Sequence, residues 1–271
     1  MKAAIIIVCV LTAIFLLGWL GLKVKPKPFD AYPQQSGAVE TMPLPKGLPA
    51  PVERYYRVLY GENVPLITSV VITGRATLRV IGNIPFPGRF RFTHEAGQSY
   101  RHYIETTWFG LPLMKVNERY LESVSRVDLP FGTTEDEPKV NQGANLGLWA
   151  ESVWFPSIWL TDERVRWEAL DADSAVLVVP FEEAEEHLIA RFDPETGLLS
   201  LLEAMRYQGA DSESKTLWIT EAGDWGQLEG QLQMTVGAAR WLDQATAWAI
   251  FDVDEVIYNV DVNDYLRTIG P

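Results

Sequence analysis

The distribution of apolar and polar residues divides the chain into three parts. The first is an uninterrupted apolar run of twenty residues from Ala3 to Leu22, followed by Lys23, Lys25 and Lys27. A helix of this length rises about 30 Å, which matches the hydrocarbon core of a bilayer. The run is too long for the apolar part of a signal peptide, and no small-x-small cleavage site follows it. We therefore expect an uncleaved transmembrane anchor over residues 1–24, with the lipid bilayer as a partner through residues 3–22.

The second part is rich in proline. Seven prolines lie between residues 26 and 51, in a stretch without helical or strand periodicity. This composition favours an extended, semi-rigid linker. We therefore expect a tether over residues 25–48 and a single β-rich domain over residues 49–271.

The third part has the pattern of an antiparallel sheet. From Leu66 onwards, short apolar runs are separated by turn signals, and Phe90 and Phe92 alternate with arginines, so that one strand face is apolar and the other polar. About ten strands with few helices are typical of a sandwich, a barrel or a half-barrel. The lack of crossover helices excludes a parallel α/β fold. Our interpretation is a mainly β fold, in which a large curved antiparallel sheet, or half-barrel, surrounds a central aromatic helix.

Two helices are predicted within the domain. A short one over residues 52–61 should cover one end of the sheet. In the central one, Leu146, Trp149 and Val153 share a face, and Pro156 ends the helix. Several tryptophans gather around this second helix. It is therefore expected in the mouth of the curved sheet, either as plain core or as the lining of a pocket.

Composition excludes some classes of function. The chain has 23 Lys and Arg against 36 Asp and Glu, a net charge of -13. Such a surface repels phosphates, so nucleic acid is not an expected partner. Cys9 is the only cysteine and lies in the apolar run, which rules out an intrachain disulfide and is not the setting of a lipid-modified cysteine. Glycine-rich phosphate loops and a GxSxG elbow are absent, and no cofactor is expected.

The histidines and acidic clusters have no metal-site spacing. His94, His102 and His187 fall on separate predicted strands, without an HExxH motif. They are expected to be surface histidines. The acidic run FEEAEEH lacks the ligand spacing of a calcium loop and is expected to be a solvated turn. The sequence therefore predicts no metal.

Glu151 is the polar residue of greatest interest, because it lies between two tryptophans on the central helix. Arg166, Arg191 or Arg206 could reach it from neighbouring strands. A carboxylate in an aromatic cavity could act as an acid or a base. A structural ion pair that closes the helix onto the sheet explains the residue as well, and it is the interpretation we favour.

Three segments, NQGANLGLWAESVWFPSIWLTDERVRWE, RFDPETGLL and VIYNVDVNDYLR, resemble an uncharacterised bacterial family of membrane-anchored proteins of unknown function. The resemblance covers nearly all of the chain after the tether and implies no established activity. More loosely, the plan of meandering strands around a helix is similar to the half-barrels of periplasmic lipoprotein carriers and mycobacterial lipid-binding lipoproteins. This second likeness implies an extracytoplasmic domain on a single-pass cell-membrane protein, although the lysines after the anchor favour the opposite orientation.

Three functions are compatible with these observations. The favoured one is a non-catalytic binding protein that holds a lipid or another apolar ligand between the central helix and the sheet. The alternatives are a lipid- or glycan-modifying enzyme that uses Glu151, and an envelope scaffold with a filled core. The residues expected to line the ligand site are Trp149, Ala150, Glu151, Val153, Trp154, Trp167, Arg191 and Arg206.

Overall fold

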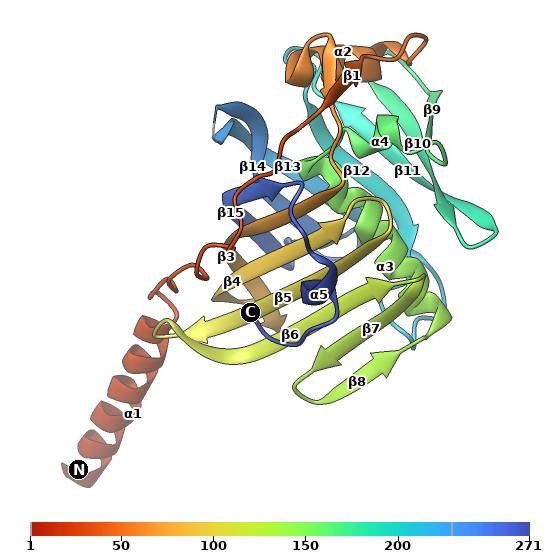
Figure 1. Ribbon diagram of the computed structural model, residues 1–271. Helices are drawn as coiled ribbons and strands as arrows, with labels where there is room; N and C mark the ends of the chain where they lie inside the picture. Colours follow the sequence, from red (N-terminus) through yellow and green to blue (C-terminus); the bar gives the residue numbers. More distant parts are fainter. Residues whose placement is uncertain (1, 229) are drawn as a thin grey trace.

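The computed structural model describes residues 2–228 and 230–271, and its main feature is one antiparallel sheet of thirteen strands in that part of the chain (Figure 1). The order across the sheet is β8-β7-β6-β5-β4-β3-β15-β14-β13-β12-β11-β10-β9. The strands are β3 (Ser69–Ile81), β4 (Ile84–Glu95), β5 (Ser99–Trp108), β6 (Leu111–Leu121), β7 (Val124–Leu129), β8 (Gly132–Glu135), β9 (Arg166–Ala169), β10 (Ser174–Phe181), β11 (Ala184–Phe192), β12 (Leu199–Arg206), β13 (Thr216–Leu228), β14 (Gln231–Trp241) and β15 (Ala249–Tyr258). The sheet curves without closing, since β8 and β9 are free edges. The predicted half-barrel is therefore confirmed.

Two meanders meet in the middle of this sheet. Strands β3 to β8 form one meander and β9 to β15 the other, and the pairing of β3 with β15 joins them. Gly74 of β3 lies opposite Val253, beside a register shift in β15. A Cβ atom on Gly74 would lie 2.1 Å from the carbonyl oxygen of Asp252, so only glycine allows the two backbones to approach this closely.

The central helix lies inside the curve of the sheet (Figure 1). Helix α3 (Pro138–Ala150) continues as a single 3-10 turn, η1 (Glu151–Trp154), and every residue from Asn141 to Ala150 is buried. It packs against β6 and β7 of one meander and against β10 and β12 of the other. The helix begins at Pro138, a residue that suits the first turn of a helix.

Smaller elements close the end of the sheet next to β10 and β11. Helix α2 (Ala50–Tyr60) buries Val52, Tyr55 and Tyr56. The Tyr56 hydroxyl donates a hydrogen bond of 2.8 Å to the carbonyl of Pro156. The short pair β1 (Thr41–Pro43) and β2 (Asn63–Pro65) flanks α2, and helix α4 (Ile158–Thr161) follows the central helix.

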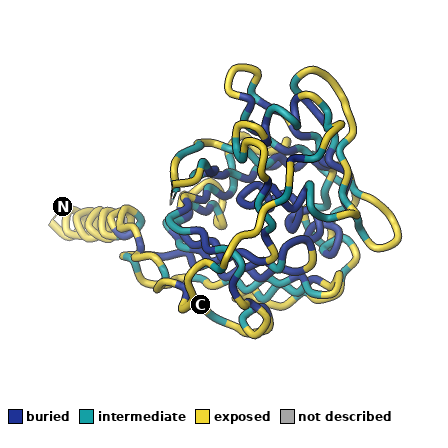
Figure 2. Tube along the Cα trace, turned by 45° about the horizontal axis from the view of Figure 1, so that its top comes forward, coloured by how far each residue is buried: buried dark blue, intermediate teal, exposed yellow. Residues whose placement is uncertain are grey.

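The N-terminal helix α1 (Lys2–Gly21) is exposed along almost its whole length and stands apart from the domain (Figure 2). Its length and composition fit a membrane span or a signal sequence. The proline-rich segment that follows is extended but is not a free tether. It lies on the outer face of the sheet, where Tyr32 packs with helix α5 (Asn263–Leu266).

One turn made by residues other than glycine was not predicted. Glu122 and Ser123 have φ angles of 53° and 65°, and they form the hairpin turn between β6 and β7. Two left-handed residues are what a two-residue hairpin turn requires, and asparagine or glycine usually signals it.

The apolar strand β10 lies beside the edge strand β9.

Candidate functional site

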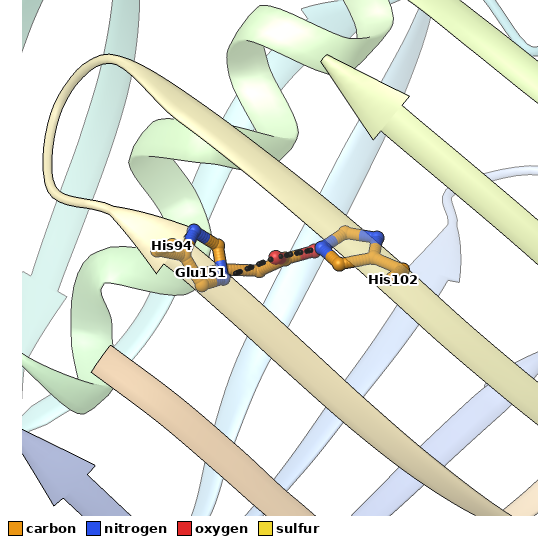
Figure 3. Close-up of side chains that lie close together, drawn as sticks. All are labelled: His94, His102 and Glu151. Atoms are coloured by element: carbon orange, nitrogen blue, oxygen red, sulfur yellow. Dashed lines mark hydrogen bonds and ion pairs between the residues drawn. The ribbon is translucent and has the colours of Figure 1, made fainter. Parts of the chain in front are cut away.

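The inner faces of β4, β5 and β6 carry a polar cluster. Along β4, Phe92 and His94 point to the same side, because side chains alternate along a strand. Register places His102 of β5 between Phe92 on one side and Glu118 of β6 on the other. Glu151, at the start of η1, reaches this face from the central helix (Figure 3). Strand pairing and the end of the helix thus bring together residues that are up to 57 positions apart in the sequence.

The cluster is built around the Glu151 carboxylate. Its Oε2 lies 2.6 Å from Nε2 of His102 and 3.3 Å from Nε2 of His94 (Figure 3). Nδ1 of His102 lies 3.8 Å from Oε2 of Glu118. The Tyr100 hydroxyl donates a hydrogen bond of 2.5 Å to Oε1 of Glu118. Two carboxylates therefore flank the His102 ring, one at each nitrogen.

These contacts set the charges of the group. Burial lowers the pKa of His102, but the two carboxylates outweigh it and bring that pKa to about 9. Burial raises the pKa of Glu151, but His102 and His94 outweigh it and hold that pKa at about 2. Burial lowers the pKa of His94, which is wholly enclosed. At neutral pH the cluster thus contains a protonated His102, a neutral His94 and an ionised Glu151.

Arg206 adds a second positive charge. Its guanidinium lies over the indole of Trp218, with 4.5 Å between the guanidinium carbon and the ring centroid. Burial raises the pKa of Glu118, but the positive charge of His102, the hydrogen bond from Tyr100 and the charge of Arg206 outweigh this effect and hold the pKa below its usual value. Two carboxylates thus face two cations, which lets four charged groups share one largely buried site.

An apolar cavity opens from this cluster. Unfilled space amounts to about 790 Å³ including the part open to solvent, and about 100 Å³ of it admits the centre of a water molecule. His102, Glu118, Glu151 and Arg206 lie at its polar end. Its apolar wall combines the central helix with strands of both meanders and includes Phe92, Ile104, Ala150, Val153, Trp154, Leu199, Leu202, Trp218, Met234, Trp248 and Phe251.

The residues proposed from the sequence divide into two groups. Ala150, Glu151, Val153, Trp154 and Arg206 line this cavity. Trp149, Trp167 and Arg191 do not. Trp149 is buried in the core, where its carbonyl accepts a hydrogen bond from Trp159, and Trp167 stacks edge-on against Trp159.

Two of the three arginines that could have reached Glu151 pair with other carboxylates. Arg191 is exposed and pairs with Glu203 on the next strand, and Arg166 pairs with Glu185. The partners of Glu151 are histidines. A one-residue step along a strand moves a side chain to the opposite face, and Arg191 lies on the outer one.

The expectation of surface histidines is wrong for two of the three. His94 and His102 are buried, whereas His187 is exposed as expected. The alternation that marks Phe90 and Phe92 as inward-facing continues to His94, so the sequence contained a signal for one of them.

The cluster offers the groups for two kinds of chemistry. His94, His102 and Glu151 each present one ligand atom, and these atoms lie within 4.8 Å of one another, so they could hold a metal ion. A protonated His102 beside the cavity could also donate a hydrogen bond or a proton to a bound molecule.

Comparisons with known proteins give a family and a distant likeness of fold. Similar solved structures include a LolA superfamily protein from Nitrosomonas europaea, with a TM-score of 0.48, 9% identity and coverage of 82% of this chain and 99% of that one. A DUF1329 family protein from Desulfovibrio piger has a TM-score of 0.43 and 9% identity over 78% of this chain and 91% of its own. A search of curated proteins finds no match. The profile of a family of unknown function, DUF6544, matches residues 38–253, and the chain therefore belongs to this family, as its motifs implied.

Proposed function

We propose that the protein is a membrane-anchored binding protein whose half-barrel holds an amphiphilic ligand, such as an acyl lipid. The observation that carries this proposal is the cavity itself, which has an apolar wall and a charged cluster at one end. Binding sites for small molecules typically combine a mostly apolar lining with a few polar groups that orient the ligand. An acyl chain would lie along the wall, and its head group would lie beside His102 and Arg206.

Unpartnered N–H donors lie on residues along the cavity. Four N–H groups on residues that line the cavity are buried and have no acceptor among the described residues: Nε of Arg206 and Nε1 of Trp154, Trp218 and Trp248. Buried donors without a partner are costly, and a ligand can supply what they lack. A carboxylate, ester or phosphate oxygen accepts such bonds. The donors therefore favour an oxygen-bearing ligand over a pure hydrocarbon.

Side chains must move to admit a chain of this size. A volume of about 100 Å³ holds a few water molecules, whereas pockets for drug-sized ligands measure about 300–1,000 Å³. Met234 lies in the wall, and its unbranched side chain adapts readily to a new shape. Binding of an acyl chain would thus widen a narrow cavity that already exists.

The end of the sheet beside α1 is suited to contact a bilayer. Seven exposed apolar residues lie at the neighbouring β3–β4 and β5–β6 tips: Val80, Ile81, Ile84, Trp108, Phe109, Leu111 and Leu113. An exposed apolar group of this kind marks an interaction surface. Nε1 of Trp108 donates to the carbonyl of Gly18 at 3.1 Å, and the amide of Phe109 donates to that of Gly21 at 2.9 Å. With α1 in a membrane, these tips would lie at its surface.

Charge and position support the same orientation. Lys23, Lys25 and Lys27 follow α1 in a protein whose net charge is -13, and lysines near a membrane surface favour anionic lipids. The carbonyl of Trp248, in the cavity wall, accepts a hydrogen bond of 2.8 Å from Arg79 at the end of β3. One end of the cavity therefore lies near the β3–β4 tip.

A larger side chain at position 150 should displace the ligand. We expect the full-length protein, purified in mild detergent, to carry lipid that native mass spectrometry detects, and Ala150→Phe to lower its occupancy about tenfold. Ala238→Leu is a second variant, on a half-buried residue of the wall. The control is Ala169→Phe, which changes an exposed residue of β9. Wild-type protein without lipid and without uptake of a fluorescent fatty acid would refute the proposal, as would full occupancy in both cavity variants.

The bilayer contact has its own test. We expect a fluorophore on Leu111→Cys, in a Cys9→Ser background, to be quenched by quencher-bearing lipids in anionic nanodiscs. The matched control is Leu170→Cys, because Leu170 is also an exposed leucine but lies in the β9–β10 connection. That connection adjoins α2, to which Asp173 is paired through Arg54. Equal quenching at both positions would contradict the proposed orientation.

A further inference from the structure

We infer that His94, His102 and Glu151 form a binding site for a divalent transition-metal ion at the polar end of the cavity. One ligand atom from each residue lies within 4.8 Å of the other two (Figure 3). Two imidazoles and one carboxylate are the protein ligands of one well-known type of zinc site, which leaves the fourth position for water or substrate. This inference goes beyond ligand binding and does not depend on it.

His94 is the first reason to expect a cation. Its ring is wholly buried, and Nδ1 has no polar partner among the described residues. Nε2 faces the Glu151 carboxylate at 3.3 Å but without hydrogen-bond geometry. A buried group left unsatisfied in this way points to an ion or a water molecule that completes its surroundings. A cation between His94 and Glu151 would satisfy Nε2 of His94.

The rigidity of the supporting structure is the second reason. His94 and His102 stand on paired strands, with Tyr100 opposite His94 and Phe92 opposite His102. Glu151 is fixed by the end of a helix that is buried from Asn141 onwards. Ligands held on such elements keep their geometry better than ligands on loops.

The third reason is the carboxylate behind His102. Glu118 lies 3.8 Å from Nδ1 of His102 and accepts a hydrogen bond from Tyr100. A carboxylate on the far nitrogen of a ligating histidine orients the ring and raises its basicity. Metal binding would displace the proton between His102 and Glu151 and separate these two groups by less than about 1 Å, given metal–nitrogen bonds of about 2 Å.

The open position of the metal would face the cavity. His102 and Glu151 line the cavity, whereas His94 lies behind them. A water molecule or an oxygen atom of a bound molecule would occupy the fourth position. Zn²⁺ is the natural probe, because nitrogen and oxygen ligands suit it, and Co²⁺ reports the geometry by its visible spectrum.

The experiment measures metal binding directly. Full-length protein in detergent, stripped with a chelator and then dialysed, is titrated with Zn²⁺ in a calorimeter. We expect one equivalent to bind, and His94→Gln and Glu151→Gln to weaken binding by roughly 100-fold or more. The matched control is His187→Gln, because His187 is an exposed strand histidine with no place in the cluster. It should bind like the wild type.

Two outcomes would overturn the inference. One is the absence of stoichiometric Zn²⁺ binding by the wild type together with a Co²⁺ spectrum equal to that of the free ion. The other is an unchanged affinity in the His94 and Glu151 variants. The Co²⁺ spectrum of the wild type decides the matter even where a variant fails to fold. Because the titration involves no lipid, a negative result would not bear on the proposed lipid binding, which the occupancy measurements test separately.

Discussion

Replacing Glu151 with alanine is expected to lower the free energy of unfolding by about 3 kcal/mol near pH 6, measured with a chelator present. The reason is that His102 keeps its positive charge in a buried site while its nearest counter-ion, 2.6 Å away, is lost. Removing one partner of a buried pair costs more than the pair itself contributes, since the remaining charge is left uncompensated.

The loss of stability caused by Glu151→Ala should depend on pH in a defined way. Folding raises the pKa of His102 to about 9 from 6.5. The stability that protonated His102 contributes is therefore complete below about pH 6.5 and is lost as the pH rises through 9. Folding lowers the pKa of Glu151 to about 2 from 4.5, so its contribution is present above pH 4.5 and is lost as the pH falls toward 2. The difference between wild type and variant should therefore be largest between about pH 4.5 and 6.5.

The control is Glu185→Ala, which removes an exposed carboxylate paired with Arg166 and should change stability little. Denaturant unfolding in detergent, followed by tryptophan fluorescence, gives both values. A cost for Glu151→Ala no larger than for the control, or one that does not vary with pH, would show that the carboxylate is not paired as described.

Gly74→Ala should destabilise the domain by about 3 kcal/mol or more, the upper range for overpacked sites. The new methyl group would lie 2.1 Å from the carbonyl oxygen of Asp252 and 2.9 Å from Cε1 of Phe90. The backbone oxygen cannot turn aside as a flexible side chain can. Strand β15 must therefore move away from β3 and lose pairing where the two meanders join.

Gly209→Ala is the matched control, because a Cβ atom at that position would meet nothing within 4 Å. It should unfold at the same denaturant concentration as the wild type. Equal stability of the two alanine variants would mean that β3 and β15 can separate without cost, which contradicts the tight approach at Gly74.

The sequence predicted the architecture because the architecture depends on local patterns. Alternation such as that of Phe90 and Phe92 identifies strands, and the face shared by Leu146, Trp149 and Val153 identifies the central helix. Turns made by glycine were found, whereas the turn at Glu122 and Ser123 was not, because acidic residues and serine rarely adopt two successive left-handed conformations.

The site was predicted only in part, because it depends on long-range pairing. Glu151 was identified from its position between tryptophans, but its partners depend on the register of β4, β5 and β6, which no local pattern reveals. For the same reason the far wall, with Trp218, Met234 and Phe251, was missed. Those strands face the helix only because β15 pairs with β3, some 180 residues earlier in the chain.

That pairing also governs how the domain can be made. Strand β3 pairs with β4 on one side and with β15 on the other. During synthesis it therefore has one neighbour, β4, and presents an unpaired edge until β15 leaves the ribosome. Contacts this distant along a chain form slowly. A nascent domain of this topology therefore keeps one edge of β3 unpaired while the whole second meander, β9 to β15, is synthesised, and an open strand edge of this kind is prone to aggregation.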